Sequence, residues 1–223
     1  MIKPLKICKD IYRVGSSELT HPYDCCVYLI DADELILIDA GAGRSFEQIV
    51  ANIKGLGFKT ERLKTIIVTH AHIDHIGALH EFQESLNVRI IAHELDADAI
   101  ESGIGVGAEY YGVNYSGCRV DVRITVSETL LKIGNYELGL VHIPGHTPGS
   151  IAVYIDVDRK RVLFGQDIHG PYNRAWGADP VKAKISLQRL IDLKADILCE
   201  GHFGVFKPAF TVEEYIRQYL DSV

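Results

Sequence analysis

The stretch from Thr69 to Gly77, which reads THAHIDHIG, gathers three histidines and one aspartate within six residues. Neutral imidazoles and carboxylates are groups that hold zinc and similar divalent ions in proteins. The four side chains, His70, His72, Asp74 and His75, are more donors than one ion easily takes from a single turn. Positions 70 and 72 also point away from 74 and 75, so the spacing favours two metal ions that share this segment.

Further metal donors are expected elsewhere in the chain, because one turn cannot complete two coordination spheres. Three apolar runs are each followed by a histidine or an aspartate close to a glycine: His146 in PGHTPG, Asp167 in FGQD and His202 in EGHFG. Glycine allows the backbone to come close to a bound group. These three residues are therefore predicted to contribute the remaining ligands.

The elements that position these donors follow from the hydrophobic periodicity. A β-branched run at 65–69 predicts a buried strand, and apolar positions recurring over 76–86 predict a helix, so the histidine cluster occupies a strand-to-helix turn. Other strands are expected at 11–14, 26–30, 35–38, 88–92, 122–126, 130–133, 138–143, 151–155, 162–164 and 197–199, and helices at 46–55, 94–100, 181–193 and 212–220. Strand-rich runs with a helix or two in each half predict sheets that face each other with helices outside.

Composition and charge narrow the class of protein. The chain has 223 residues, 47% of them hydrophobic, and its 23 basic and 30 acidic residues give a net charge of −7 without any basic run. A nucleic-acid partner and a membrane partner are therefore not expected, and no apolar stretch is long enough for a membrane span or a secretion signal. Five cysteines without CxxC spacing argue against a disulfide framework, so a cytoplasmic location is expected.

Residues 1–223 are predicted to form a single domain, because no Pro-rich or Ser-rich linker divides them. Within it, residues 102–117 are rich in glycine and tyrosine, a composition that suits a mobile flap. Tyr110 and Tyr111 of this flap are candidate substrate-binding residues, and the alternative that they form a homodimer contact stays open.

Taken together, the motifs resemble the metallo-β-lactamase superfamily in its glyoxalase II-like (hydroxyacylglutathione hydrolase-like) branch, from the Asp39-Ala40-Gly41 turn to His202. The resemblance implies an α+β fold, a four-layer αββα sandwich. It implies one metal ion held by His70, His72 and His146, a second held by Asp74, His75 and His202, and a bridging carboxylate from Asp167.

The function implied is that of a binuclear metal-dependent hydrolase, which cleaves a small thioester, ester or lactone by attack of a metal-bridging hydroxide. The cofactors expected are two divalent ions, with zinc favoured and iron or manganese as alternatives. A bound metal lowers the pKa of water to about 7, so that a hydroxide forms at neutral pH. The same ligands also occur in mononuclear iron persulfide dioxygenases and in phosphodiesterases or nucleases. A metal-stabilised binding module without activity is a further alternative.

Other residues are candidates for catalysis or substrate binding. Asp74 and His169 are the candidate catalytic residues, with His169 placed two positions after Asp167 and either in substrate contact, in proton transfer or in a plain loop. Tyr172 is a weaker candidate for substrate binding, against a packed loop aromatic. Asp39 either holds a metal-binding histidine or caps a helix.

Overall fold

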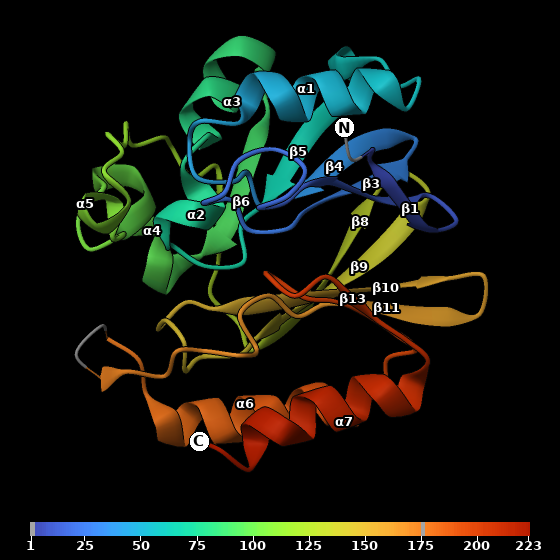
Figure 1. Cartoon of the computed structure of the whole chain (residues 1–223), viewed down its shortest axis with the longest axis vertical. Coiled ribbons are helices and arrows are strands. Elements are labelled where there is room, and N and C mark those ends of the chain that lie inside the picture. Colours follow the sequence, from blue (N-terminus) through green and yellow to red (C-terminus); the bar gives the residue numbers. More distant parts are fainter. Residues whose placement is uncertain (1–2, 175–176) are drawn as a thin grey trace. The chain divides into compact units, whose positions relative to one another are not determined.

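The chain divides into two compact units. The computed structural model describes residues 3–174 and 177–223, and the division falls between unit 1, Met1–Ile124, and unit 2, Thr125–Val223 (Figure 1). Each unit has one β-sheet and its own helices, so the α+β class predicted from the sequence is confirmed. Among the described residues no helix has both the length and the apolar character needed to cross a membrane.

Unit 1 contains a seven-stranded sheet in which strand order follows chain order. The strands are β1 (Leu5–Cys8), β2 (Ile11–Gly15), β3 (Val27–Ala32), β4 (Glu34–Ile38), β5 (Leu63–Ile67), β6 (Arg89–His93) and β7 (Val122–Ile124). Neighbours are antiparallel from β1 to β4 and parallel from β4 to β7. The carboxyl ends of β4 and β5 therefore lie at the same edge of the sheet.

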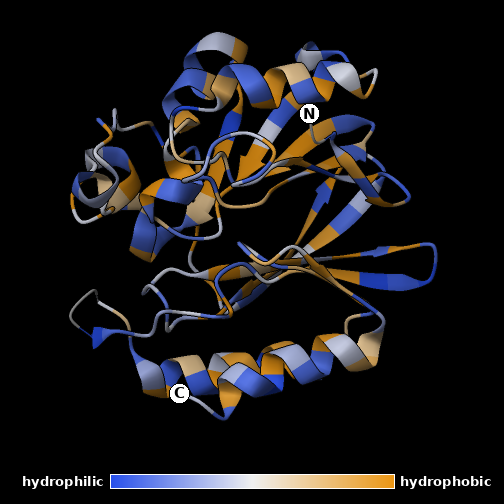
Figure 2. Cartoon of the chain, viewed as in Figure 1, coloured by the Kyte–Doolittle hydropathy of each residue, from blue (hydrophilic) through white to orange (hydrophobic). Residues whose placement is uncertain are grey.

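The three longer helices of unit 1 each bury one face. They are α1 (Phe46–Gly55), α3 (Leu79–Leu86) and α4 (Glu94–Ser102), with two single turns, α2 (Ile73–Ile76) and α5 (Ala108–Tyr111), and a short 3-10 helix, η1 (Thr60–Arg62). Ile49 and Ile53 of α1 and Phe82 of α3 are fully buried in one core cluster with the sheet. Figure 2 shows the alternation of apolar and polar residues along α1 that this packing requires.

The helix expected over 76–86 is interrupted in the structure. It divides into α2 and α3 at Gly77 and Ala78: Gly77 keeps helical dihedral angles, whereas Ala78, with φ of −97° and ψ of 9°, departs from them. The strand expected at 65–69 ends at Ile67 in the structure. The Thr69 amide hydrogen donates to the Asp39 carboxylate, at 2.8 Å, instead of to a neighbouring strand.

Unit 2 contains a six-stranded sheet with the order β13-β12-β11-β10-β9-β8. Its strands are β8 (Glu128–Ile133), β9 (Tyr136–His142), β10 (Ile151–Val157), β11 (Lys160–Phe164), β12 (Ile197–Cys199) and β13 (Val205–Phe206). All neighbours are antiparallel except β11 and β12, which are parallel. The helices α6 (Pro180–Asp192) and α7 (Ala209–Leu220) cover one face of this sheet (Figure 1).

Candidate metal centre

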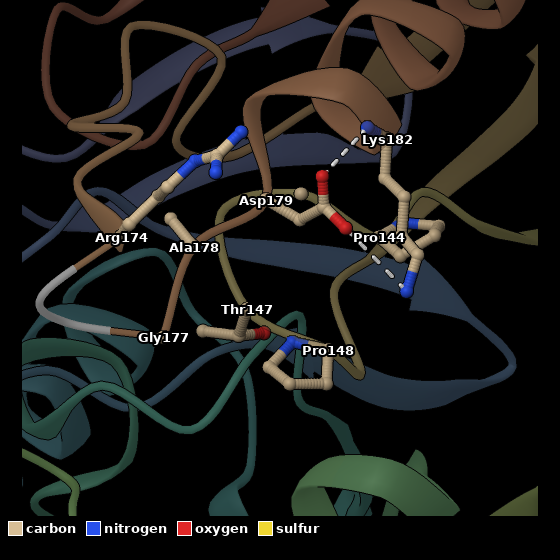
Figure 3. A pocket seen from close by; sticks show the side chains of 9 residues that line it. Pro144, Thr147, Pro148, Arg174, Gly177, Ala178, Asp179 and Lys182 are labelled. Atoms are coloured by element: carbon tan, nitrogen blue, oxygen red, sulfur yellow. Dashed lines mark hydrogen bonds and ion pairs between the residues drawn. The ribbon is translucent and has the colours of Figure 1, made fainter.

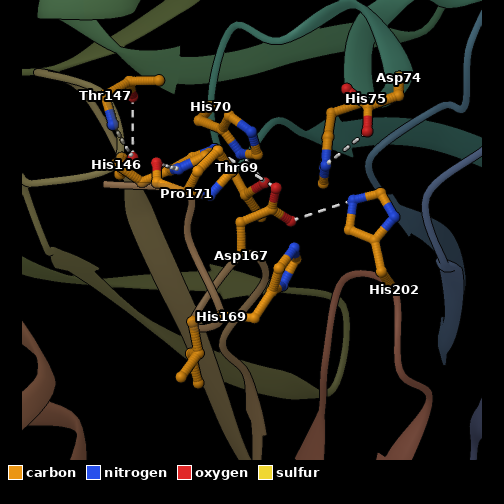
Figure 4. Close-up of polar contacts among 12 residues, drawn as sticks. Thr69, His70, Asp74, His75, His146, Thr147, Asp167, His169, Pro171 and His202 are labelled. Carbon is orange, nitrogen blue, oxygen red and sulfur yellow. Dashed lines mark hydrogen bonds and ion pairs between the residues drawn. The ribbon is translucent and has the colours of Figure 1, made fainter. Parts of the chain in front are cut away.

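The histidine cluster of unit 1 occupies the turn between β5 and α2. His72 is the residue before α2, and Asp74 and His75 lie inside its single turn. The rings of His70 and His72 have centroids 4.8 Å apart, and those of His70 and His75 are 4.0 Å apart. His75 Nε2 lies 3.6 Å from an Asp74 carboxylate oxygen (Figure 4). The turn thus gathers three imidazoles and a carboxylate, most of them buried, as the spacing predicts.

Asp39 orients one of these histidines. Its carboxylate is fully buried and accepts the Nδ1–H of His75 at 2.7 Å and the hydroxyl of Thr69 at 2.7 Å. A histidine that donates through Nδ1 keeps its lone pair on Nε2, which is the form that binds a metal ion. Of the two roles considered for Asp39, the contact with a histidine is confirmed, and Ser45 precedes α1 as its N-cap residue.

Two contacts that were not expected from the sequence support the same turn. The Ala71 amide donates to the carboxylate of Asp96, a buried residue of α4, at 3.0 Å. The Ile73 amide donates to the carbonyl of Val106 at 2.8 Å. Both partners lie far along the chain from the turn, so no local pattern in the sequence could have indicated them.

In unit 2 the Asp167 carboxylate lies between two histidines. Oδ2 of Asp167 is 3.3 Å from His146 Nε2, and Oδ1 is 3.4 Å from His202 Nε2 (Figure 4). Asp167 follows β11, His202 follows β12, and His146 lies between β9 and β10. One carboxylate oxygen therefore faces each imidazole.

Backbone contacts hold His146 in this orientation. Its Nδ1–H donates to the carbonyl of Pro171 at 3.2 Å, which leaves the lone pair on Nε2. The turn that follows is closed by Thr147, whose amide donates to the Ser150 hydroxyl at 3.0 Å and whose own hydroxyl lies 2.8 Å from it. Ser150 therefore supports the turn that carries His146.

Glu200 was not singled out from the sequence, yet it connects two of the predicted site residues. It is completely buried, and its Oε1 lies 2.8 Å from Nδ1 of His169. Its Oε2 accepts the amides of His202 and Phe203 at 2.7 and 2.8 Å. The carboxylate thus fixes the His169 ring and the turn that carries His202. Asp167, His169 and His202 also offer ligand atoms within 4.8 Å of one another.

The predicted substrate-binding tyrosines have different surroundings. Tyr110 is 76% exposed, whereas the ring of Tyr111 packs edge-on against Tyr23 with centroids 5.3 Å apart. Tyr172 donates its hydroxyl to the carbonyl of Ile168 at 2.8 Å and packs against the core of unit 2. Burial, with the Asp167 charge as a second cause, raises the pKa of Tyr172.

Cys25 lies in a buried group with Asp39 and His75. Burial raises the pKa of the Cys25 thiol well above its ordinary value, although the neighbouring His75 acts in the opposite direction. All five cysteines are free thiols, as the absence of paired spacing predicts.

The chemistry of the donors within each unit fits divalent metal ions. A tetrahedral ion with ligand bonds of about 2.0–2.1 Å separates two of its ligand atoms by roughly 3.3–3.4 Å. The nitrogen–oxygen separations of 3.3 and 3.4 Å around Asp167 match that value. They are longer than the 2.7–3.2 Å of an ordinary N–H···O hydrogen bond. The donor set is also of the nitrogen and oxygen type that zinc, manganese and iron accept.

Comparison with known proteins identifies the family. Residues 22–202 match the family model of the metallo-beta-lactamase superfamily, so the chain belongs to this superfamily. A metallo-β-lactamase variant from Cronobacter sakazakii is 22% identical and shares the fold with a TM-score of 0.84, covering 100% of this chain and 95% of its own. The sandwich fold class expected from the sequence is thereby confirmed, and the chain is a metal-dependent hydrolase.

Three relatives add detail. A metallo-beta-lactamase fold-containing protein from Sulfurisphaera tokodaii is 25% identical over 96% of this chain and 86% of its own length. The hydroxyacylglutathione hydrolase GloC of Haemophilus influenzae is 29% identical over 65% of this chain and 66% of its own. The acyl-coenzyme A thioesterase MBLAC2 of Bos taurus is 29% identical over 63% of this chain and 56% of its own.

Proposed function

We propose that the protein is a binuclear hydrolase of small thioesters, with esters and lactones as related substrates. The proposed ligands are those that the resemblance implies: His70, His72 and His146 for one ion, Asp74, His75 and His202 for the other, and Asp167 for both. Zinc is the proposed metal, since neutral imidazoles and carboxylates suit it.

The observation that carries the binuclear proposal is the position of Asp167. Its two carboxylate oxygens face different imidazoles, His146 and His202, at nearly equal separations of 3.3 and 3.4 Å. A carboxylate with one oxygen toward each imidazole could contribute to two ions, and this arrangement supports the proposal.

The chemistry proposed requires little acid catalysis from the chain. Two divalent ions, when bound, supply a water-derived nucleophile at neutral pH and polarise a carbonyl oxygen. Asp39 and Pro171 hold the rings of His75 and His146 with their Nε2 lone pairs available, so the donors need no rearrangement. The proposed role of Asp74 is to hold its ion beside His75.

Thioesters are favoured within the proposed substrates because a thiolate leaves without a proton. Among the relatives, one is described as a hydroxyacylglutathione hydrolase and another as an acyl-coenzyme A thioesterase. His169 is proposed to contact the substrate, with its ring fixed by Glu200 through Nδ1. We also propose that the exposed Tyr110 contacts the substrate. Tyr111 and Tyr172 are further proposed substrate contacts.

The decisive experiment replaces His72 and Asp167 separately by alanine and assays a thioester panel with saturating zinc or manganese. Turnover is expected to fall by about 10³-fold or more in each variant, because a proposed ligand of the metal ions that activate the water is lost. His21→Ala is the matched control, since His21 interacts locally with Tyr23 and is not a proposed ligand. Undiminished turnover in either ligand variant would contradict the proposal.

Metal analysis of the purified protein tests the number and kind of ions. Two divalent ions per chain, reduced in the Asp167→Ala variant, are the expected result. A single iron ion per chain, together with oxygen uptake on a persulfide and no thioester turnover, would instead indicate a dioxygenase.

A further inference from the structure

Unit 2 contains a cavity beside the loop that carries His146 (Figure 3). Its volume is about 390 Å³, enough for a phosphate or carboxylate group together with several neighbouring atoms. Two prolines, Pro144 and Pro148, form part of its wall, and Arg174 and Lys182 supply two cationic side chains. The cavity therefore combines apolar surface with positive charge.

The walls of this cavity are fixed to the segment that holds His146. The Asp179 amide donates to the carbonyl of Gly145 at 2.8 Å, and the Ser186 hydroxyl donates to the carbonyl of Pro144 at 2.7 Å. Asp179 is the N-cap residue of α6 and Ser186 lies at the middle of this helix, so both contacts attach the loop to α6. A group bound in the cavity would thus be held on the same rigid frame as the His146 imidazole.

The one acidic residue of the cavity, Asp179, is engaged by the helix. Its Oδ1 accepts the amides of Val181 and Lys182 at 3.1 and 3.2 Å, and its Oδ2 lies 3.6 Å from the Lys182 ammonium (Figure 3). The hydrogen bond from the Lys182 amide is the main cause that lowers the pKa of Asp179, so the carboxyl stays ionised.

Arg174 lacks such a partner in the part of the chain that the structure describes, where no ion pair to its guanidinium is found. Its planar fork is suited to a carboxylate or a phosphate, which it can bind through two parallel hydrogen bonds. In a chain with a net charge of −7, this local excess of positive charge would favour an anion that the rest of the surface repels.

We propose that this cavity binds an anionic group of the substrate, at a distance from the scissile carbonyl. The inference rests on the proposed function and narrows it: the preferred substrates are thioesters whose thiol part ends in carboxylates or phosphates. Arg174 is the principal contact and Lys182 the second, while the two prolines pack against the adjoining chain of the ligand.

The first test measures binding without catalysis by isothermal titration of the metal-loaded protein. S-methylglutathione offers carboxylates, S-methyl-coenzyme A offers phosphates, and S-methyl-N-acetylcysteamine is neutral; the thioethers avoid thiolate ligation of the metal. At least one anionic probe is expected to bind, and Arg174→Glu is expected to raise its Kd by about tenfold or more.

The matched control is Lys184→Ala, compared with Lys182→Ala. Lys184 is an exposed lysine of the same helix that does not line the cavity, so both variants change the net charge equally. Only the Lys182 variant is expected to weaken anion binding. Equal Kd values for wild type, Arg174→Glu and Lys182→Ala, or no binding of either anionic probe, would overturn the inference.

Kinetics separate this inference from the function on which it rests. With the corresponding thioesters, Arg174→Glu should raise KM for the anionic substrate and leave KM and kcat for the neutral one unchanged. If the wild type hydrolyses no thioester while Arg174-dependent anion binding persists, the proposed function fails and the anion site stands. If all thioesters are hydrolysed equally by wild type and Arg174→Glu, the anion site fails and the function stands.

Discussion

At the scale of single residues, two buried carboxylates hold histidines in place. Asp39 accepts from His75, and Glu200 contacts His169, each at hydrogen-bonding distance. The role of Asp39 could be anticipated, because metal-binding histidines commonly donate their second nitrogen to a carboxylate. Glu200 was not anticipated, because its partner His169 is not one of the proposed metal ligands and no residue pattern connects the two positions, which lie 31 residues apart along the chain.

The carboxylate of Asp39 allows a prediction about metal affinity. We expect Asp39→Asn to weaken metal binding by about 10–100-fold, because an amide in this position loses the charge that favours the His75 donor. Asparagine also tolerates the left-handed backbone of this residue, whose φ is +63°. Competition with a chromophoric chelator measures the affinity.

Asp24→Asn is the matched control for that substitution. Asp24 is a buried aspartate that accepts the Ala42 amide at 2.8 Å, so it holds the same loop through the backbone of Ala42 and not through the His75 ring. Its replacement is expected to change stability and to leave metal affinity within about twofold. An unchanged affinity in Asp39→Asn would show that the His75 contact is only structural.

A second residue-scale prediction concerns alkaline pH. Burial raises the pKa of Cys118 to about 12, whereas an unfolded thiol ionises near its ordinary value of about 8.5. The folded chain therefore binds more protons between these values, and the Cys118 contribution to the free energy of unfolding is present at low pH and lost as the pH rises toward 12.

Denaturant unfolding of wild type and Cys118→Ala at several pH values from about 8 to about 11 measures this effect. The stability difference between the two proteins should shrink as the pH rises. Cys8→Ala, at a partly exposed thiol, should show no such trend. A difference that is constant with pH would contradict the assignment.

At the scale of elements, hydrophobic periodicity predicts most of the structure. The strand at 197–199 and the helix at 46–55 have the expected bounds, and α6 begins and ends one residue before the predicted range. The strands β1 and β13 were missed because they are short and partly exposed, with weak alternation. The break between α2 and α3 was missed because the apolar spacing of Ile76, Leu79 and Phe82 continues through it, although the backbone departs from helical geometry at Ala78.

The junction between the His146 loop and α6 provides a prediction at this scale. A Cβ atom on Gly145 would lie 2.6 Å from the Cβ of Ala183, and the backbone φ of +150° also disfavours a side chain. Gly145→Ala should therefore cost about 1–3 kcal/mol and lower Tm by several degrees. Thermal unfolding followed by circular dichroism measures the change.

The control glycine is Gly55, the last residue of α1. Among the described residues, nothing outside this helix lies within 4 Å of the position that a Cβ atom would take, so alanine meets no obstacle there. Because alanine favours a helix more than glycine does, Gly55→Ala should leave Tm unchanged or raise it. A Tm for Gly145→Ala equal to that of wild type would show that the loop and α6 can move apart to accommodate the added methyl group.

At the scale of the whole molecule, the order of the metal donors along the chain is the sequence feature that best indicates the family. Four proposed ligands lie in unit 1 and three in unit 2, and each follows a strand. This regularity let the family and the ligand candidates be anticipated from the sequence. The substrate could not be anticipated, because the surroundings of surface side chains form only when distant segments pack.

Metal removal is expected to lower the stability of the chain, because an ion that binds only the folded state stabilises that state. A ligand present at about 1,000 times its Kd stabilises a folded protein by about 4 kcal/mol. Chelation is thus expected to lower Tm by on the order of 10 °C for a chain of this size. Scanning calorimetry with and without the chelator tests this, and the shift should be smaller in Asp167→Ala. Identical transitions with and without metal would contradict the proposal.

The contact between Asp39 and His75 has a consequence for metal selection. Since the imidazole is oriented by the protein itself, the entropic penalty of ordering it is met during folding and not when an ion arrives. The nitrogen and oxygen donors themselves suit several first-row ions, whose intrinsic affinities follow the Irving–Williams series. Which ion occupies the protein in a cell would then depend on the local supply of metals as well as on the donors of the site.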